Sequence, residues 1–247
     1  MATEILLSLR YLKIVKQKMD NTLNSNYLNS NLSFEEGRVM DMSTGFAVMM
    51  EWETPLIEES ADFLCHYPGR VLNIGHGMGI IDSFISSKNP VHHYIIEGHP
   101  QVWEENLVKK GWLQKPNTTC IFSDWRNVDW NSLPYFDAIY IDTFMEDEED
   151  FMKNILPRIL APGGRFSWFN NSKSKDQVLE ENKVKIMQEH DYVVRHKVIT
   201  NFKAPDPFLQ SGGDAAYWFP DWDKYILPIV YNRNLGITGS NTFKLWN

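Results

Sequence analysis

The pattern of apolar and polar positions changes character near residue 70. Before it, apolar side chains recur at helical spacing over residues 3–20, an Asn- and Ser-rich stretch covers 20–31, and residues 32–42 alternate around Glu36-Gly37. Helical spacing predicts an amphipathic helix, Asn and Ser favour turns, and alternation about a glycine predicts a β-hairpin. We therefore expect a helical arm, a linker and a hairpin within residues 1–45, followed by one large domain over residues 46–247.

From residue 69 onward, short apolar runs alternate with helical patterns. This alternation predicts a doubly wound, mostly parallel α/β sheet of the Rossmann-like type. The pair Asn89-Pro90 and the turn Ala161–Gly164 punctuate the pattern where helices end. The predicted strands cover residues 71–74, 93–97, 119–123, 138–142, 165–169, 192–203 and 218–230, and the predicted helices cover 80–87, 101–110, 148–160 and 175–190.

The composition suits one large folded domain, because 247 residues with 43% hydrophobic and 23% charged content can bury a substantial core. The formal net charge of −8 argues against an extended interface with nucleic acid or an anionic membrane, since clustered Lys and Arg bind phosphates. No apolar run approaches the ~18 residues of a membrane helix. Cys65, Cys120 and the pair His92-His93 lack metal-site spacing. We expect a cytoplasmic protein that binds no metal, nucleic acid or membrane.

A glycine loop follows the first predicted strand of the sheet. Gly75-His76-Gly77-Met78-Gly79 joins that strand to a helix, and Glu97 ends the next strand about 20 residues later. Glycines let the backbone turn and approach a ligand, and a carboxylate at this place can accept hydrogen bonds from two ribose hydroxyls. A glycine loop alone is weak evidence, because many turns need glycine. With Glu97, it predicts a site for an adenosine-containing cofactor.

Two later segments narrow the class of enzyme. Phe136–Asp142 and Leu160–Gly164 follow the glycine loop and Glu97 in chain order. This ordered set resembles class I S-adenosylmethionine-dependent methyltransferases, whereas a nicotinamide enzyme would carry more βα units after the acid. The resemblance implies S-adenosylmethionine as cofactor. One departure is Asn73, which stands where that superfamily often has an acidic residue.

A closer resemblance covers residues 42–230, most of the chain. Met50-Glu51-Trp52-Glu53-Thr54-Pro55, Gly75–Met78, Ile95–Glu97 and Ile141–Phe144 resemble the guanidino-group methyltransferases, which comprise guanidinoacetate N-methyltransferase and the arginine and protein-arginine delta-N-methyltransferases. His76 departs from the family, which usually has Phe there. The segment Asp124–Arg126 matches the family's Trp segment only loosely.

The resemblance implies roles for individual residues. Glu53 and Asp142 would grip the guanidinium of the acceptor as the catalytic pair. The implied cofactor contacts are Met49, Gly75, His76, Gly77, Met78, Gly79, Ile80, Ile81, Glu97, Gly98, His99, Trp125 and Arg126, and the implied substrate contacts are Trp52, Glu53, Asp142, Thr143, Asn171, Ser172 and, as part of the aromatic run 217–222, Tyr217.

Physical chemistry supports two carboxylates at such a site. A guanidinium is planar, carries five N–H donors and stays protonated, so its nitrogens are poor nucleophiles until a proton leaves. Two carboxylates can orient it by charge-assisted hydrogen bonds and accept that proton. A purely structural interpretation is also open, in which Thr54-Pro55 starts a helix beside Glu53 and Asp142 only caps a strand.

Four functions remain open at this point. We expect methylation of free arginine or an arginine-like metabolite, because the arm before the domain is short beside the added N-terminal region of fungal protein-modifying relatives. The alternatives are protein-arginine delta-N-methylation, guanidinoacetate methylation, and an inactive S-adenosylmethionine-binding paralogue suggested by Asn73 and His76. The amphipathic helix over residues 3–20 also suggests a homodimer.

Overall fold

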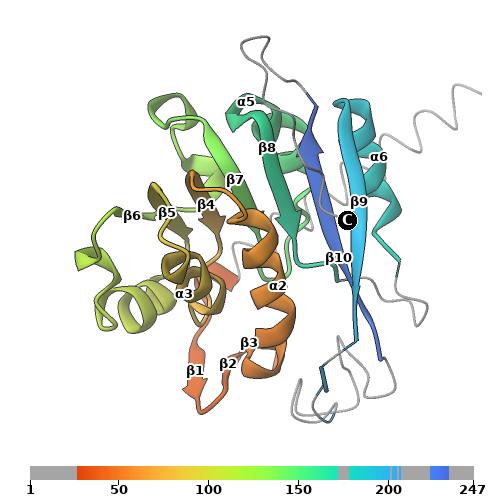
Figure 1. The fold of residues 1–247 in the computed structure, drawn as a ribbon. Helices are drawn as coiled ribbons and strands as arrows, with labels where there is room; N and C mark the ends of the chain where they lie inside the picture. The colour runs from red at the N-terminus through yellow and green to blue at the C-terminus, as the bar shows by residue number, and fades with distance from the viewer. Residues whose placement is uncertain (1–26, 172–177, 201, 205, 207–222, 234–247) are drawn as a thin grey trace, which may run out of the picture.

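The computed structural model describes residues 27–171, 178–200, 202–204, 206 and 223–233, and its largest feature is a seven-stranded sheet (Figure 1). Neighbouring strands in the first five positions are parallel, and the sixth is antiparallel to both of its neighbours. This arrangement confirms the prediction of a doubly wound, mostly parallel sheet. In spatial order the strands are β6 (Thr118–Phe122), β5 (His92–Glu97), β4 (Arg70–Ile74), β7 (Phe136–Ile141), β8 (Leu160–Trp168), β10 (Tyr225–Asn232) and β9 (Tyr192–Ile199).

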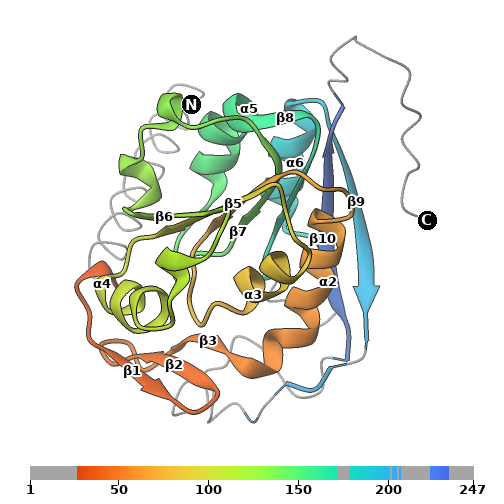
Figure 2. The ribbon, with the colours of Figure 1, turned by 60° about the vertical axis from the view of Figure 1, so that its left-hand side comes forward.

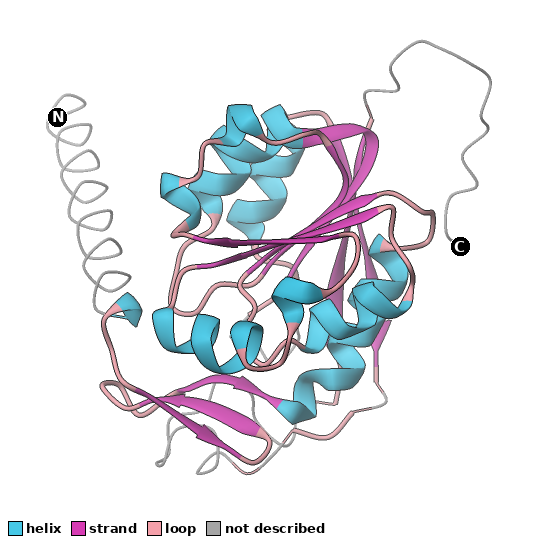
Figure 3. Ribbon diagram, turned by 90° about the vertical axis from the view of Figure 1, so that its left-hand side faces the viewer, coloured by secondary structure: helices cyan, strands magenta, loops and turns pink. Residues whose placement is uncertain are grey.

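Helices cover both faces of this sheet (Figure 3). Along β4, Val71 belongs to the apolar core on one face, and Leu72 and Ile74 belong to the core on the other. Successive side chains of a strand point to opposite faces, so a central strand covered on both sides is apolar at most of its positions. The helices on the Val71 side are α2 (Thr54–Leu64) and α3 (Ile80–Ser87), and those on the other side include α5 (Leu156–Ile159) and α6 (Glu181–Glu189).

The predicted helices differ from the observed ones mainly in regularity. α3 has the predicted bounds. The helix predicted over residues 101–110 consists of α4 (Pro100–Val102) and a π-helical segment, η2 (Trp103–Val108). The helix predicted over 148–160 consists of a π-helical segment, η6 (Phe151–Ile155), followed by α5, which begins afresh because Pro157 has no N–H to donate.

The C-terminal part follows the predicted order with shorter elements. α6 begins at Glu181 rather than residue 175, and β9 ends at Ile199 rather than 203. β10 runs to Asn232, and residues 218–222 of the strand predicted there lie outside the described residues.

A second, three-stranded antiparallel sheet precedes the large one. It contains β1 (Leu32–Glu35), β2 (Arg38–Asp41) and β3 (Ala47–Met50). The hairpin predicted around Glu36-Gly37 is confirmed, with Gly37 at φ +74°. β3 was not predicted, and it pairs with β2, so the small sheet extends across the predicted division at residue 45.

The small sheet lies beside α3 and α4 (Figure 2). Leu32 and Val39 share an apolar cluster with Val102 of α4. The predicted helix over residues 3–20 lies outside the described residues. The homodimer suggested on the basis of that helix therefore stays a prediction. Within the described residues, no helix combines the length and apolar character needed to cross a membrane.

Candidate functional site

A cleft opens where β4, β5 and β7 end, at the carboxyl edge of the parallel strands, where open α/β sheets bind their ligands. It encloses about 590 Å³ of empty space, part of which is open to solvent. Its lining residues are Tyr27, Leu28, Val48, Met49, Ile74, Gly75, Gly77, Ile96, Glu97, Gly98, Ser123, Asp124, Trp125, Asp142, Thr143, Phe144 and Glu146. Eight of these were named from the sequence as cofactor or substrate contacts: Met49, Gly75, Gly77, Glu97, Gly98, Trp125, Asp142 and Thr143.

The glycine loop forms the floor of the cleft in a conformation that side chains would disturb. Gly75 has φ +91°, and a β-carbon there would overlap the main-chain oxygen of Asp142. Gly77 has φ +52°, and a β-carbon there would come within 2.8 Å of Met49 Sδ. On this loop, Asn106 Nδ2 donates a hydrogen bond of 2.7 Å to the Gly77 carbonyl. The backbone of residues 75–77 can therefore approach a ligand closely.

Glu97 ends β5 with a buried carboxylate that is held by backbone donors. Its Oε2 accepts a hydrogen bond from the His76 N–H at 2.8 Å, and its Oε1 accepts one from the His99 N–H at 2.6 Å. Burial raises the pKa of Glu97 above its ordinary value, although these backbone hydrogen bonds oppose the shift. Each carboxylate oxygen has two lone pairs, so both can still accept a further hydrogen bond from a ligand hydroxyl.

The opposite wall of the cleft comes from the segments after β6 and β7. Trp125 Nε1 donates a hydrogen bond to Glu146 Oε2 at 2.7 Å, and Arg126 Nη1 donates one to Glu146 Oε1 at 3.1 Å. The Arg126 guanidinium stacks over the Trp125 ring, 4.2 Å from its centroid. Glu146 therefore joins the two segments with one carboxylate.

Asp142 is a half-buried carboxylate in the lining of the cleft, and Glu53 is a buried carboxylate whose charge acts on it. Asp142 follows β7, and its N–H donates a hydrogen bond to the Ile74 carbonyl at 3.0 Å. Burial raises the pKa of Asp142 well above its ordinary value, and the charges of Glu53 and Glu148 raise it further. Glu53 is 4% exposed, and its Oε1 accepts a hydrogen bond from the Met50 N–H at 3.0 Å. Carboxylates whose charges disfavour one another in this way favour a cation beside them.

Glu53 comes from the turn that links the two sheets. The 3₁₀ turn η1 (Glu51–Glu53) leads from β3 into α2, and Pro55 occupies the start of α2. The helix start predicted at Thr54-Pro55 is confirmed. The Glu53 side chain folds back over this turn, and its connection with the cleft is its charge, which raises the pKa of Asp142.

A buried ion pair supports the segment that carries Asp142. Lys183 Nζ lies 2.6 Å from Glu148 Oε2 and 2.8 Å from Glu180 Oε2. Thr143 Oγ1 donates a hydrogen bond of 3.4 Å to Glu148 Oε1. Burial lowers the pKa of Lys183, but the charges of Glu148 and Glu180 more than offset that effect and raise it. Lys183 therefore stays protonated and anchors the Asp142 segment to α6.

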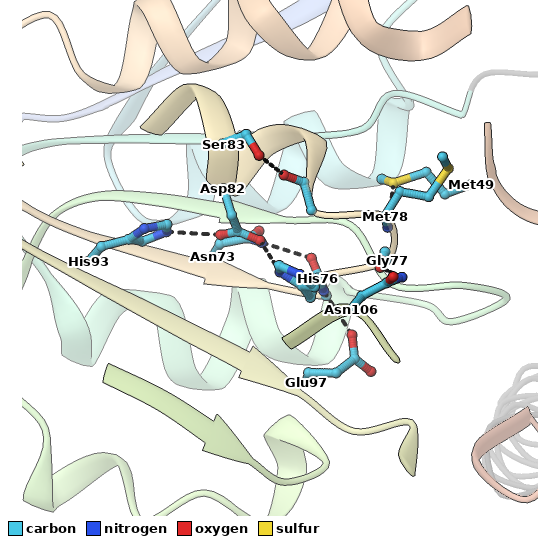
Figure 4. Close-up of polar contacts among 12 residues, drawn as sticks. Met49, Asn73, His76, Gly77, Met78, Asp82, Ser83, His93, Glu97 and Asn106 are labelled. Atoms are coloured by element: carbon cyan, nitrogen blue, oxygen red, sulfur yellow. Dashed lines mark hydrogen bonds and ion pairs between the residues drawn. The ribbon is translucent and has the colours of Figure 1, made fainter. Parts of the chain in front are cut away.

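The remaining residues named from the sequence, Glu53 among them, do not line the cleft. The His76 ring is fully buried beneath the loop (Figure 4), and the Met78 N–H donates to Met49 Sδ at 3.2 Å. Gly79, Ile80 and Ile81 begin α3, and Trp52 packs near Phe202. The others are His99, stacked on Tyr27; Arg126, described above; Asn171, which is exposed; and Ser172 and Tyr217, which lie outside the described residues.

Sequence reasoning missed several lining residues. Tyr27 comes from the stretch interpreted as a linker, and its ring packs against His99 and Phe144 at centroid distances of 4.8 and 4.9 Å. Glu146 belongs to the acidic run over residues 146–150, a pattern that is typical of a solvated helix start. An aromatic side chain in an Asn-rich stretch was the available signal for Tyr27. Among the described residues, no group of three His, Cys, Asp or Glu side chains could hold a metal ion.

Comparison of the sequence with profiles of known protein families identifies the family of this chain. A family profile described as guanidinoacetate N-methyltransferase matches residues 17–204. The chain belongs to that family, in agreement with the motifs around Glu53, the glycine loop and Asp142.

Curated proteins with similar sequences are named for a different acceptor from that in the family description. A protein named protein arginine N-methyltransferase 2 from Aspergillus oryzae is 41% identical over 225 residues, which cover 87% of this chain and 48% of that protein. Proteins of the same name from Emericella nidulans and Yarrowia lipolytica are 36% and 34% identical, over 83% and 82% of this chain and 49% and 46% of those proteins. The chain thus spans about half the length of the curated relatives it matches.

Solved structures show the same fold at low sequence identity. Precorrin-6y C5,15-methyltransferase from Geobacter metallireducens has a TM-score of 0.51 and 12% identity, with 80% of this chain and 93% of that chain covered. The [4+2]-cyclase SpnF has a TM-score of 0.52 and 14% identity, with coverages of 78% and 85%. The shared fold is the Rossmann-like sheet of class I methyltransferases. Since a cyclase shares it, the fold alone does not define the chemistry.

Proposed function

We propose that this protein transfers the methyl group of S-adenosylmethionine to a guanidino nitrogen of arginine. Family membership and the names of the curated relatives support a guanidino acceptor. The observation that carries the proposal is the Asp142 carboxylate in the cleft lining, beside a glycine loop of the kind that binds adenosine cofactors, together with the buried carboxylate of Glu53, whose charge raises the pKa of Asp142.

The cleft fits S-adenosylmethionine by its own geometry. Gly75 and Gly77 leave backbone exposed where β-carbons would collide with Asp142 and Met49. Glu97 offers two carboxylate oxygens with lone pairs to spare, in the place suited to ribose hydroxyls. Trp125 supplies an aromatic wall on the other side. The bound cofactor would supply an electrophilic methyl group on a sulfonium centre.

The acceptor would be held and activated by this chain's own acids. A guanidinium fits two carboxylates because its N–H donors form a rigid planar fork. The pKa of Asp142, raised by burial and by the charges of Glu53 and Glu148, falls when a cation binds beside it, so the acceptor enters as the partner of two ionised carboxylates. Asp142 and Glu53 then fix one nitrogen toward the methyl group, and one of them accepts the proton that this nitrogen loses.

We favour an arginine residue of a protein as the acceptor. The relatives at 34–41% identity are named for protein arginine. The expectation of free arginine rested on the short N-terminal arm, and the length of a segment outside the catalytic domain does not identify an acceptor. The departures that suggested an inactive paralogue, Asn73 and His76, have partners of their own in Asp82.

The proposal is tested by product analysis. Purified protein is incubated with S-adenosylmethionine and, separately, with arginine-containing peptides, free arginine and guanidinoacetate, and the products are identified by mass spectrometry. We expect a mass gain of one methyl group on the arginine peptides, and fragmentation identifies the nitrogen. If S-adenosylhomocysteine binds but none of the acceptors gains a methyl group, the transferase proposal is wrong.

A further inference from the structure

Asp82, in the first turn of α3, is a buried carboxylate that the proposed chemistry does not use. Its side chain is fully buried. Its Oδ2 accepts a hydrogen bond from Asn73 Nδ2 at 2.8 Å and lies 2.6 Å from His76 Nδ1, while its Oδ1 lies 2.9 Å from His93 Nε2 (Figure 4). A charged group in the interior is costly unless several donors satisfy it. Asn73 on β4 and His76 on the glycine loop make hydrogen-bonding contacts with Oδ2, and the His93 ring on β5 faces Oδ1.

These contacts connect Asp82 to the ligand-facing side of the glycine loop. Asn73 Nδ2 also donates a hydrogen bond to the Gly75 carbonyl at 2.8 Å. His76, whose ring contacts Asp82, donates its backbone N–H to Glu97 Oε2 at 2.8 Å. Two short chains of contacts therefore start at the Asp82 carboxylate. One runs through Asn73 to the Gly75 carbonyl, and the other runs through His76 to Glu97.

The loop depends on such support because its glycines are the most flexible residues available. Gly75, Gly77 and Gly79 all have positive φ, at +91°, +52° and +80°. The His76 ring fills the space beneath Gly79, where a β-carbon would come within 2.9 Å of it. A fixed ring at position 76 therefore restrains the last glycine as well as the peptide that contacts Glu97.

Asp82 is suited to act as a permanent acceptor. Burial raises its pKa, but the charge and hydrogen bond of His76 and those of His93 lower it further, to about 2. The carboxylate is therefore ionised throughout the neutral range, and it also lies at the N-terminal end of α3, where the helix dipole favours negative charge.

We propose that Asp82 is a positioning residue for cofactor binding, which acts through His76 and Asn73 to hold the glycine loop in its ligand-ready conformation. This inference rests on the proposed assignment of the cleft to S-adenosylmethionine. Asp82 does not line the cleft, so it sets the affinity for the cofactor while the turnover number at saturating cofactor stays within about twofold. Asn73 and His76 are then parts of one support rather than degraded cofactor contacts.

The first test measures the affinity for S-adenosylhomocysteine by titration calorimetry, with no acceptor present. Asp82→Asn replaces a carboxylate oxygen by an amide NH₂, which cannot accept the hydrogen bonds that the carboxylate accepts. We expect the dissociation constant for S-adenosylhomocysteine to rise tenfold or more. The matched control is Ile85→Val, which loses a buried methyl group one turn further along α3 and removes none of the hydrogen bonds around Asp82. The control should lose stability and keep its affinity within twofold. Equal changes of affinity in both variants would mean that Asp82 has only a general structural role.

A double-mutant cycle tests the path through His76. His76→Phe keeps a ring beneath Gly79, which preserves the packing there, and removes the contact with Asp82. We expect the double variant Asp82→Asn/His76→Phe to raise the dissociation constant by less than the product of the two single effects. Multiplicative effects would contradict a path through His76.

Hydrogen exchange of the cofactor-free protein gives a readout that needs no ligand. The amides of residues 76–79 should exchange faster in Asp82→Asn than in the wild type, and unchanged rates there would contradict the inference. Wild-type protein that fails to bind S-adenosylhomocysteine would instead contradict the proposed function. Wild-type binding with unchanged affinity in Asp82→Asn contradicts the role of Asp82 alone.

Discussion

The main-chain oxygen of Asp142 occupies the position that a β-carbon on Gly75 would need. The two residues end adjacent parallel strands, and the Asp142 N–H donates a hydrogen bond to the Ile74 carbonyl at 3.0 Å. The segment that carries Asp142, the carboxylate proposed to bind the acceptor, therefore rests directly on the glycine loop. The close approach of the Gly75 and Asp142 backbones therefore joins the proposed cofactor site to the proposed acceptor site.

Gly75→Ala should abolish cofactor binding and destabilise the protein. The positive φ alone costs an L-residue roughly 1–2 kcal/mol, and the collision with Asp142 adds to it. The matched control is Gly111→Ala, because Gly111 has φ +75° with no atom closer than 3.6 Å to a β-carbon and lies outside the cleft lining. Calorimetric titration and thermal unfolding distinguish them. A Gly75→Ala protein that binds S-adenosylhomocysteine normally would refute the assigned role of the loop.

Glu146→Ala should weaken cofactor binding by about tenfold, since a net hydrogen bond of ~1–1.5 kcal/mol to Trp125 disappears. The tryptophan emission should shift toward the red as the Trp125 indole loses its partner and gains water. Glu149→Ala is the control, because Glu149 pairs with Lys153 and does not line the cleft. If the two variants bind S-adenosylhomocysteine equally well, Glu146 does not organise the wall.

Lys183→Met should lower the free energy of unfolding by roughly 3–5 kcal/mol, because it leaves Glu148 buried without its cation. Turnover should fall as well, since Glu148 holds Thr143 beside Asp142. Lys185→Met, on an exposed position of the same helix, should change the free energy of unfolding by less than about 0.5 kcal/mol. Urea denaturation measures both. Equal losses of unfolding free energy in Lys183→Met and Lys185→Met would show that the buried ion pair of Lys183 and Glu148 does not stabilise the protein.

Asp142 should make the protein less stable as the pH rises. Burial, Glu53 and Glu148 raise its pKa in the folded state, so the folded protein holds this proton more tightly than the unfolded chain. The stabilisation from the bound proton is complete below the ordinary Asp pKa and is lost as the pH rises through the raised value. Asp142→Asn should therefore melt above the wild type at pH 8, and the difference should shrink toward pH 4.

The size of this effect can be measured by thermal unfolding between pH 4 and pH 8. A relief of ~1 kcal/mol shifts Tm by roughly 2–4 °C in a protein of this size. Asp62→Asn, at a surface carboxylate paired with Lys88, is the control and should not gain stability at high pH. Lower stability of Asp142→Asn at every pH would show that the carboxylate is structural rather than a strained functional group.

The succession of strands and helices along the chain follows directly from the sequence, because buried parallel strands show as short apolar runs between helical patterns. β3 escaped prediction, since its four residues lead straight into η1 and α2 and show no alternation of their own. The π-helical segments also escaped it, because a pattern of apolar positions does not distinguish an α-helix from a slightly wider one.

The site was predictable where a local motif carries it. Gly75, Gly77, Glu97 and Asp142 each lie at or just after the end of a parallel strand. Because these strand ends share one edge of the sheet, the fold brings the four residues together in the cleft. The cluster around Asp82 depends on packing between α3, β4 and β5, which no local pattern reveals. One signal was present: Asp82 follows Ile80-Ile81 on a helix whose neighbours are buried, and a carboxylate there requires an explanation.

The two carboxylates remain the centre of the proposal, and one paired measurement tests them most directly. Glu53→Gln and Asp142→Asn are assayed for methyl transfer to an arginine peptide and titrated with S-adenosylhomocysteine. We predict that each variant loses at least about 100-fold in turnover, as expected when a positioned base is removed, while its affinity for S-adenosylhomocysteine stays within about threefold of the wild type. Wild-type turnover in either variant would contradict the account.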